Sequence, residues 1–401
     1  MGRFSFNFIR LRLGVRKRRN AKMPTSILEV HTKSELKEWV LFPFHFYRED
    51  PNYVPQIIRE ELDFFSAGSN PGFKIADTKL LLAKQNDKTI GRVCGIIHRL
   101  EEEKLGYKRG RFGWFECIDD PEAAAALLGY LEEWFVREGC REITGPHGFT
   151  DLDPEGLLVD AFDTLPTIAA SYNKPYYRRL IEDLGFEKEV DYIEHRFEFP
   201  EDNPLFKRME KWVASAEKDG YRIVKLGKKK EILPYVDQWW EVLEASFEQL
   251  YGVTPLTDEQ KKYYTKKYFG FVDPNFMIMA ADRHDRVQGL FLGLPSLSRP
   301  FQKANGRLFP FGFVHILRGF KKFDTVDFYF AGVHPQANAR KVLPVMTLAM
   351  FRALKQHGVK YIETNRELET NINITTIWSK FPVVSKRRTR IFKKQLSTPA
   401  V

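Results

Sequence analysis

Residues 110–146 read GRFGWFECIDDPEAAAALLGYLEEWFVREGCREITGP, and residues 324–365 repeat the same pattern as DTVDFYFAGVHPQANARKVLPVMTLAMFRALKQHGVKYIETN. Each stretch is typical of an apolar strand, a turn, an amphipathic helix that ends at a glycine (Gly139 or Gly358), and a short second strand. The two copies indicate a duplication. The distance between them predicts two tandem units instead of a solenoid of short repeats.

Each copy is followed by an asparagine-containing loop, a short helix and a last strand, in residues 172–199 and again in residues 368–394. The sequence therefore predicts an α+β (mixed α/β) fold with two tandem domains, each a twisted mixed sheet flanked by helices. We expect a first unit at residues 27–200 and a second at 221–395, joined by residues 201–220. One site would be shared between them.

Hydrophobic periodicity predicts the other elements. In the first unit we expect a helix at residues 34–47, strands at 79–83, 89–98 and 111–118, and a helix that begins at Asp120-Pro121. In the second unit we expect strands at 221–226, 277–281, 287–294 and 326–332, with helices at 235–251 and 339–357.

The composition is that of an ordinary globular protein, with 43% hydrophobic and 29% charged residues in a chain of 401. No apolar run approaches the roughly 18 residues that a spanning helix needs. The three cysteines, Cys94, Cys117 and Cys140, have the spacing of neither a disulfide framework nor a zinc site. We therefore expect a cytoplasmic protein without a metal.

A net charge of +10 favours an anionic partner such as CoA phosphates, acidic lipid headgroups or nucleic acid. Much of this charge lies in residues 1–26, where basic and apolar residues alternate. One interpretation is a leader that binds an anionic membrane surface, peripheral to the inner membrane. The other is a disordered leader, or a start codon upstream of a true first residue at Met23.

An insertion at residues 295–323 has no counterpart in the first unit and contains RLFPFGFVHILRGFKKF. This apolar, aromatic and basic stretch is typical of a tunnel wall for an apolar substrate or of a patch that enters a membrane. A core helix between two strands is the alternative.

The strand that ends at Gly332-Val333-His334-Pro335 leads through a short loop into a helix. Unsatisfied backbone N–H groups and the helix dipole make such a helix start a binding site for pyrophosphate, and two basic residues add positive charge. The alternative is a solvated first turn. The candidate cofactor-binding residues are Gly332, Val333, Gln336, Ala337, Asn338, Ala339, Arg340 and Lys341.

Several motifs together resemble a known family: FPFHFYREDPNYVPQI, GWFECIDDP, GLLVDAFDTLP, SYNKPYYRRLIEDLGFEK, NGRLFPFG, GVHP, ETNRELETN and SKRRTRIFKK. From about residue 27 to residue 394 the chain resembles the GNAT superfamily of acyl-CoA N-acyltransferases. More specifically, it resembles a bacterial tandem-GNAT family that includes bacterial ceramide synthases.

This resemblance implies transfer of an acyl group from acyl-CoA, the co-substrate, to a primary amine such as a long-chain sphingoid base. It implies a general base, for which Glu369 and Glu363 are the candidates, and an oxyanion donor among the backbone N–H groups of residues 331–333. Asn371 would hold the pantetheine arm or a catalytic water.

For the substrate, the acidic loop that contains His147, Asp151, Asp153 and Glu155 could face the second unit and hold the amine. Further substrate contacts are expected from the SYNKPYY and NGRLFPFG motifs. The predicted substrate-binding residues are Asp153, Glu155, Tyr172, Asn173, Phe309 and Phe311.

The pyrophosphate loop departs from the superfamily pattern, Q/R-x-x-G-x-G/A, because alanine and lysine stand where glycines are expected. In the first unit Asp119, Asp120 and Glu122 lie where phosphate would sit. Carboxylates repel phosphate, so we expect the first unit to be non-catalytic.

Two other functions remain open. An aminoacyl-tRNA-dependent transferase would need a broad basic face and usually a helical arm, yet the sequence contains no uninterrupted coiled-coil pattern, so nucleic acid is not the expected partner. A non-catalytic protein that binds lipid or a partner is favoured by the missing glycines.

Overall fold

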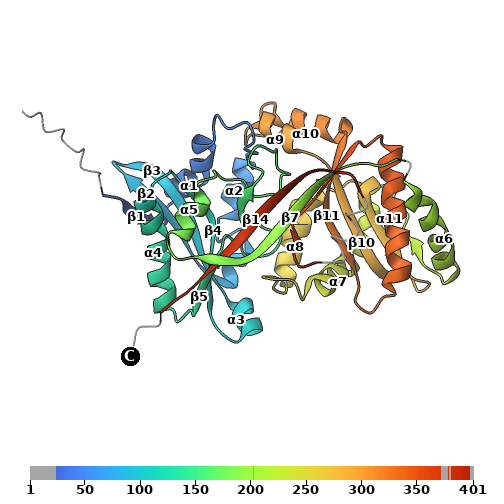
Figure 1. The fold of residues 1–401 in the computed structure, drawn as a ribbon, viewed down its shortest axis with the longest axis horizontal. Helices are drawn as coiled ribbons and strands as arrows, with labels where there is room; N and C mark the ends of the chain where they lie inside the picture. The colour runs from blue at the N-terminus through green and yellow to red at the C-terminus, as the bar shows by residue number, and fades with distance from the viewer. Residues whose placement is uncertain (1–23, 202, 372–377, 379–380, 398–401) are drawn as a thin grey trace, which may run out of the picture.

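The computed structural model describes residues 24–201, 203–371, 378 and 381–397. All but the last three residues of the predicted basic leader lie outside this part of the chain. A mixed sheet runs through both units, and helices cover its two faces (Figure 1). The sheet confirms the expected fold class.

The elements of the first unit are β1 (Ser26–Glu29), α1 (Lys33–Phe46), α2 (Ile58–Phe64), β2 (Ala76–Gln85), β3 (Lys88–His98), α3 (Arg99–Leu105), β4 (Arg109–Cys117), α4 (Pro121–Arg137), β5 (Glu142–Gly145), β6 (Leu157–Asp160), α5 (Tyr177–Glu182) and β7 (Glu187–Glu198). As predicted, Asp120 is the N-cap of α4.

The elements of the second unit are α6 (Pro204–Lys218), β8 (Arg222–Ile223), α7 (Val236–Phe247), α8 (Asp258–Phe269), β9 (Met277–Ala281), β10 (Val287–Pro295), α9 (Ser298–Ala304), α10 (Gly312–Lys321), β11 (Thr325–Val333), α11 (Ala339–Gln356), β12 (Tyr361–Thr364), β13 (Glu367–Leu368) and β14 (Val383–Gln395). The insertion thus forms two short helices, α9 and α10, instead of one core helix.

The last strand of each unit is exchanged with the other unit. Strand β7 pairs with β12 of the second unit, with Glu363 opposite Arg196. Strand β14 pairs with β5 of the first unit and along most of its length with β7. In Figure 1, β7 and β14 run side by side from one unit to the other. The result is one continuous sheet with the strand order β1-β2-β3-β4-β5-β14-β7-β12-β11-β10-β9-β8.

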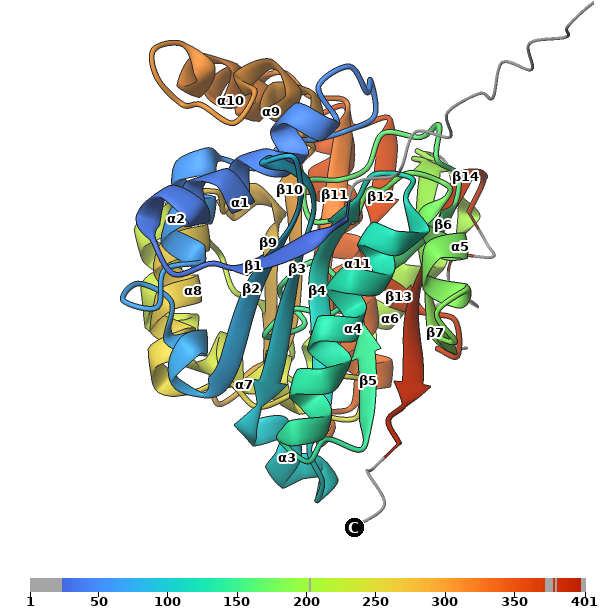
Figure 2. The ribbon, with the colours of Figure 1, turned by 90° about the vertical axis from the view of Figure 1, so that its left-hand side faces the viewer.

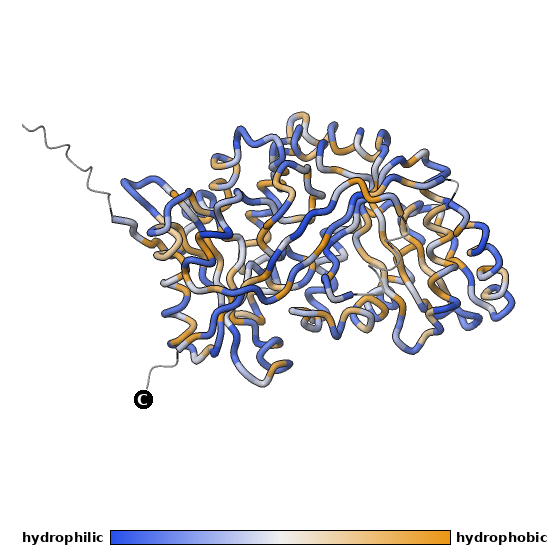
Figure 3. Tube along the Cα trace, viewed as in Figure 1, coloured by the Kyte–Doolittle hydropathy of each residue, from blue (hydrophilic) through white to orange (hydrophobic). Residues whose placement is uncertain are grey.

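The exchange extends to the hydrophobic cores. Phe392 of β14 is fully buried in the core of the first unit, beneath α4. Phe197 of β7 is fully buried in the core of the second unit, beneath α11. Figure 3 shows hydrophobic stretches along the strands inside both units, whereas the crossing part of β14 is hydrophilic. Each unit therefore lacks part of its core without the last strand of the other.

In both units two parallel strands diverge after a short paired stretch. Strands β4 and β5 pair only from Arg109 to Arg111, and β11 pairs with β12 only from Thr325 to Phe328. A bulge interrupts β4 near Trp114, whose φ is +48°, and a second one interrupts the pairing of β11 with β10. A bulge changes the direction of a strand. The fourth strand of each unit therefore turns away from the fifth and leaves a gap between them.

Candidate functional site

A cavity of about 320 Å³ lies where the two units meet. The first unit contributes Trp114, Phe115 and Glu116 from the bulged part of β4, and the second contributes Tyr329 and Phe330 from the bulged part of β11. Both strand gaps therefore open toward one space, as the duplication predicted. We call this space the shared cavity.

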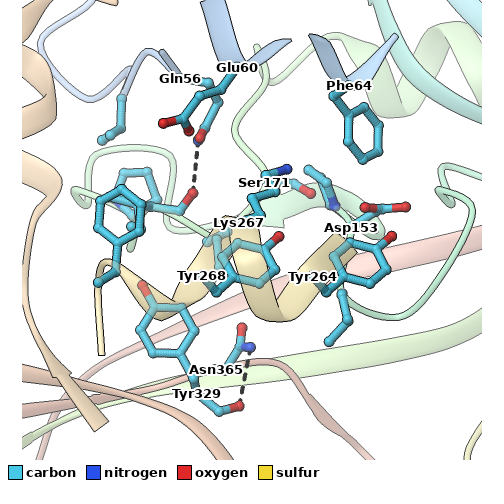
Figure 4. Close-up of a pocket in the computed structure, with 18 of the residues that line it drawn as sticks. Gln56, Glu60, Phe64, Asp153, Ser171, Tyr264, Lys267, Tyr268, Tyr329 and Asn365 are labelled. Carbon is cyan, nitrogen blue, oxygen red and sulfur yellow. Dashed lines mark hydrogen bonds between the residues drawn. The ribbon is translucent and has the colours of Figure 1, made fainter. Parts of the chain in front are cut away.

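The walls of the shared cavity are mainly apolar and aromatic, and five helices contribute to them beside the strands. They include Phe44 of α1, Phe64 of α2, Trp239 of α7, Tyr264 of α8 and Phe301 of α9. Figure 4 shows Phe64 from the first unit and Tyr329 from the second on opposite sides of Lys267 and Asp153. Such walls suit a ligand with a long hydrocarbon part.

Charged groups lie among these apolar walls, and acids outnumber bases. The cavity-lining acids are Glu60, Glu61, Glu116, Asp151 and Asp153, and the bases are Arg92, Lys267 and Arg366. A surplus of acidic side chains in a partly desolvated space suits a cation, such as a protonated amine, because a bound cation favours their ionised forms.

Asp151 joins the acidic loop of the first unit to the second unit. Its backbone carbonyl accepts a hydrogen bond of 3.2 Å from Arg366, which directly follows Asn365 at the gap beside β11. Burial, reinforced by the charge of Glu155, raises the pKa of Asp151 to about 7. The acidic loop thus contacts the second unit, as expected, and places a carboxyl group that titrates near neutral pH at the cavity wall.

Glu116 is a second carboxyl group of this kind, and sequence analysis missed it. Its Oε2 accepts hydrogen bonds from the hydroxyls of Tyr47 and Tyr177. Burial raises the pKa of Glu116 to about 7, although Arg92 and the two hydroxyls act in the opposite direction. A signal was present, because Glu116 is an acid within the otherwise mostly apolar strand GRFGWFEC.

Asp153 and Lys267 are two further charged residues of the shared cavity, and both are labelled in Figure 4. One Asp153 oxygen accepts from the backbone N–H groups of Phe149 and Thr150, and burial raises the pKa of this carboxyl to about 6. The ammonium of Lys267 lies 4.6 Å from the ring centroid of Phe64. Sequence gave no signal for Lys267, because its helix is largely polar and reads as solvated.

The other predicted substrate-binding residues are dispersed. Tyr172 lines the shared cavity and donates to Asp50, and Asn173 lines it while bonding the backbone of Leu158. Glu155 is buried against His147, with 2.6 Å between Oε1 and Nε2. The remaining pair, Phe309 and Phe311, lies on the surface, 76% and 71% exposed.

The predicted bases lie outside the shared cavity. Glu369 is ion-paired with Lys188 at 2.5 Å and with Arg388 at 3.1 Å. Glu363 is ion-paired with Arg196 and lines a second cavity, of about 530 Å³, on the same sheet. Asn371 follows β13, where its N–H donates to Leu368. The catalytic roles of all three stay predictions.

The helix starts of the two units differ in charge. Helix α11 begins at Ala339 after Asn338, which makes no side-chain cap, and Arg340 is exposed there. Lys341 instead turns to α6, where it pairs with Asp219 at 2.9 Å.

At the start of α4, by contrast, the Asp120 side chain accepts from the N–H of Glu122, and Asp119 pairs with Arg179. A free anion would meet two carboxylates there. The start of α11 is the more open of the two to phosphate.

Backbone groups of β11 face its gap. His334 donates its N–H to Gln288 of β10. Because successive N–H groups of a strand point to opposite sides, those of Val333 and Ala331 point away from β10, toward the gap. At Gly332, a Cβ atom would lie 2.3 Å from Oγ of Ser246, so the glycine allows α7 to pack closely on β11.

Among the described residues, no three or more His, Cys, Asp and Glu side chains are grouped so that they could hold a metal ion. In the same part of the chain, no helix has both the length and the apolar character to cross a membrane. A scan against models of protein families finds no match.

Two curated proteins are similar to this chain. Protein YghO from Escherichia coli (strain K12) is 27% identical over 372 residues, which cover 91% of this chain and 94% of that protein. Bacterial ceramide synthase from Caulobacter vibrioides (strain NA1000 / CB15N) is 25% identical over 295 residues, which cover 73% of this chain and 75% of that protein.

Solved structures share the fold at low sequence identity. A tandem GNAT protein from the clavulanic acid biosynthesis pathway has a TM-score of 0.54 at 10% identity, covering 94% of this chain and 100% of that one. A GCN5-related N-acetyltransferase from Sphaerobacter thermophilus has a TM-score of 0.50 at 11% identity, covering 94% and 97%. These likenesses confirm the tandem architecture.

Proposed function

We propose that this chain is an N-acyltransferase of the tandem GNAT-like family that includes bacterial ceramide synthase, to which it is similar in sequence and in fold. Its acyl donor would be a long-chain acyl-CoA and its acceptor the primary amine of a long-chain, sphingoid-type base. Because such a base resides in a bilayer, the enzyme would work at a membrane surface.

The observation that carries this proposal is the shared cavity. It combines apolar walls, which suit hydrocarbon chains, with a surplus of carboxylates, which suits an ammonium group. It also reaches Tyr329 and Phe330, where β11 leaves β12. An amine bound in the cavity would therefore lie close to a thioester held in the gap beside β11.

We place acyl-CoA on the second unit. Its pyrophosphate would bind the uncapped start of α11, residues 336–340, where N–H groups and the helix dipole favour an anion. Its thioester oxygen would accept a hydrogen bond from the N–H of Ala331 or Val333. Lys341 would contribute charge without direct contact, because it is paired with Asp219.

Asp151 is our candidate for the general base. A free amine has a pKa near ~10, so the bound ammonium must lose a proton before it can attack. With a pKa of about 7, Asp151 can accept that proton near neutral pH. The amine nitrogen then bonds to the thioester carbon and the carbon–sulfur bond breaks. The nitrogen loses its second proton to solvent as the amide forms, and the proton on Asp151 passes to the departing thiolate.

The test supplies the purified protein with palmitoyl-CoA and sphinganine and measures the amide by mass spectrometry. Wild type should form the amide, and Asp151→Asn should lower the rate at least on the order of a hundredfold. Asp160→Asn, on an exposed strand end of the first unit, is the control. If Asp151→Asn still forms the amide but Glu369→Gln or Glu363→Gln does not, the glutamate whose substitution abolishes the reaction is the general base instead of Asp151.

The absence of amide from wild type with every donor and amine offered would overturn the proposed function. Binding of palmitoyl-CoA without turnover would then favour a non-catalytic lipid-binding protein.

A further inference from the structure

The α9–α10 hairpin, residues 296–323, forms a bridge between the two units. It belongs to the second unit but is docked on the first, where Gln302 donates to the carbonyls of Pro51 and Tyr53, and the carbonyl of Gly306 accepts from Ile58. In Figure 2 it projects from one edge of the molecule above α1. The hairpin is therefore fixed in place at the junction that surrounds the shared cavity.

The inner side of the hairpin is part of the cavity wall. Phe301 lines the cavity and packs in a small core with Ile57 of the first unit and with Leu297 and Ile316 of the hairpin. All four side chains are at least 93% buried.

The outer side of the hairpin is apolar and exposed to solvent. The exposed fractions are 76% for Phe309, 71% for Phe311, 57% for Leu317 and 38% for Phe313. These four residues make up a considerable share of the large hydrophobic side chains that the described part of the chain exposes. Packing within the chain does not account for such a cluster, and exposed apolar clusters mark interaction surfaces.

The charge of the hairpin indicates which kind of partner would bind it. Residues 296–323 contain no acid and six cations, all exposed: Arg299, Lys303, Arg307, Arg318, Lys321 and Lys322. Within the described part of the chain, none of these cations has an acidic partner. Aromatic side chains at a tip with basic residues around them match the headgroup region of an anionic bilayer, which takes up apolar groups and attracts cations together.

We propose that the α9–α10 hairpin binds the surface of an anionic lipid bilayer. Phe309, Phe311 and Leu317 enter the headgroup region, and the cations bind lipid phosphates. Since the other side of the hairpin lines the shared cavity, docking brings the cavity to the bilayer. Resting on the proposed function, we infer further that the long-chain amine passes from the bilayer into the cavity along this hairpin.

The test measures co-sedimentation of the full chain with vesicles of phosphatidylcholine containing phosphatidylglycerol, and with vesicles of phosphatidylcholine alone. Wild type should bind the anionic vesicles more tightly, and added salt should weaken that binding. The double variant Phe309→Ser/Phe311→Ser should bind them at least roughly tenfold more weakly, because two large apolar anchors are lost. Arg318→Glu/Lys321→Glu should lose roughly fivefold or more for each cation.

The matched controls lie on α6: Trp212→Ser, 48% exposed, and Lys207→Glu/Lys211→Glu. They should bind vesicles like wild type. Thermal melting of each variant establishes that it is folded. If the hairpin variants bind as well as wild type, another part of the chain holds the membrane and the proposal is overturned, as it is if wild type binds neither vesicle.

A second assay distinguishes failure of the membrane proposal from failure of the proposed function: it measures amide formation from sphinganine dispersed in detergent, where no bilayer is needed. The hairpin variants should keep that activity and lose amide formation from sphinganine embedded in vesicles. If the protein binds vesicles but forms no amide from either form of sphinganine, the membrane-binding hairpin is supported and the proposed function is contradicted. Equal use of vesicle-embedded sphinganine by wild type and the hairpin variants would overturn the substrate route.

Discussion

At the scale of single residues, Glu116 is an acid of the shared cavity that burial keeps protonated up to near neutral pH. As a residue Glu116 is 9% exposed, and its carboxyl group accepts hydrogen bonds from the hydroxyls of Tyr47 and Tyr177. Its pKa of about 7 lies above the ordinary value of 4.5 because burial disfavours the ionised form. The folded protein therefore holds a proton on Glu116 that the unfolded chain releases between those two pH values.

This difference predicts a pH-dependent effect of Glu116→Gln. Below pH 4.5 both carboxyl and amide are neutral, so the two proteins should be about equally stable. Between about pH 4.5 and 7 the wild type loses stability relative to the variant, because its unfolded chain releases a proton that the folded protein keeps, and above about pH 7 the difference stays constant. At pH 8 the variant should be more stable by about 1–3 kcal/mol in urea unfolding. A stability difference independent of pH would contradict this view of Glu116.

The base assignment predicts a pH profile as well. If Asp151 accepts the amine proton, the rate of amide formation should rise with pH through about 7, where its carboxylate form becomes dominant. Asp153→Asn, which can still accept the two backbone N–H groups of the acidic loop, should keep this profile. A rate that is flat between pH 6 and 8 would exclude Asp151 as the base.

At the scale of elements, the starts of α4 and α11 explain why one repeat suits phosphate better than the other. Both helices follow the bulged strand of their unit. The side chain of Asp120 caps the N-terminus of α4, whereas no side chain caps the N-terminus of α11. The strand, turn and helix of each repeat were readable from sequence because they depend on local periodicity and capping. The ion pair between Lys341 and Asp219 at the end of α6 could not be read from the sequence, because it joins distant parts of the chain.

Asn338→Asp should convert the second start into one like the first. The added carboxylate interacts favourably with the helix dipole, so thermal stability should stay equal or rise slightly. Affinity for CoA should fall by on the order of tenfold, because a negative charge then lies beside the pyrophosphate. Gln356→Glu adds the same charge at the far end of α11 and should leave CoA binding unchanged. Unaltered CoA binding in Asn338→Asp would place the pyrophosphate elsewhere.

For the whole molecule, the exchange of β7 and β14 makes the two units depend on each other. The two repeats, most strands and helices, and a common site could be predicted from the sequence. The exchange could not, because either last strand has the alternation needed to pair with either sheet, and pairing partners leave no local pattern. The cavity residues contributed by α2 and α8 were missed for the same reason, since tertiary packing alone brings them to the gaps.

The exchange predicts that both units unfold in one transition. Phe392→Ala removes a fully buried side chain of β14 from the core of the first unit, and should lower the free energy of unfolding by about 3–5 kcal/mol. Tryptophan fluorescence and circular dichroism should shift together. Val384→Ala changes an exposed residue of the same strand and should have little effect. Separate transitions for the two units would contradict this dependence.

The central claim, that one cavity between the two units holds the hydrocarbon part of the ligand, is tested most directly by calorimetric titration with CoA and palmitoyl-CoA, the latter below its micelle concentration. Ala169→Trp narrows the cavity, and Ala125→Trp, on an exposed site of α4, is the control. We predict that wild type binds palmitoyl-CoA more tightly than CoA. Ala169→Trp should weaken palmitoyl-CoA binding roughly tenfold or more, since each buried methylene contributes about 0.8 kcal/mol, and should leave CoA binding unchanged. Equal affinity of wild type and Ala169→Trp for palmitoyl-CoA would contradict the account.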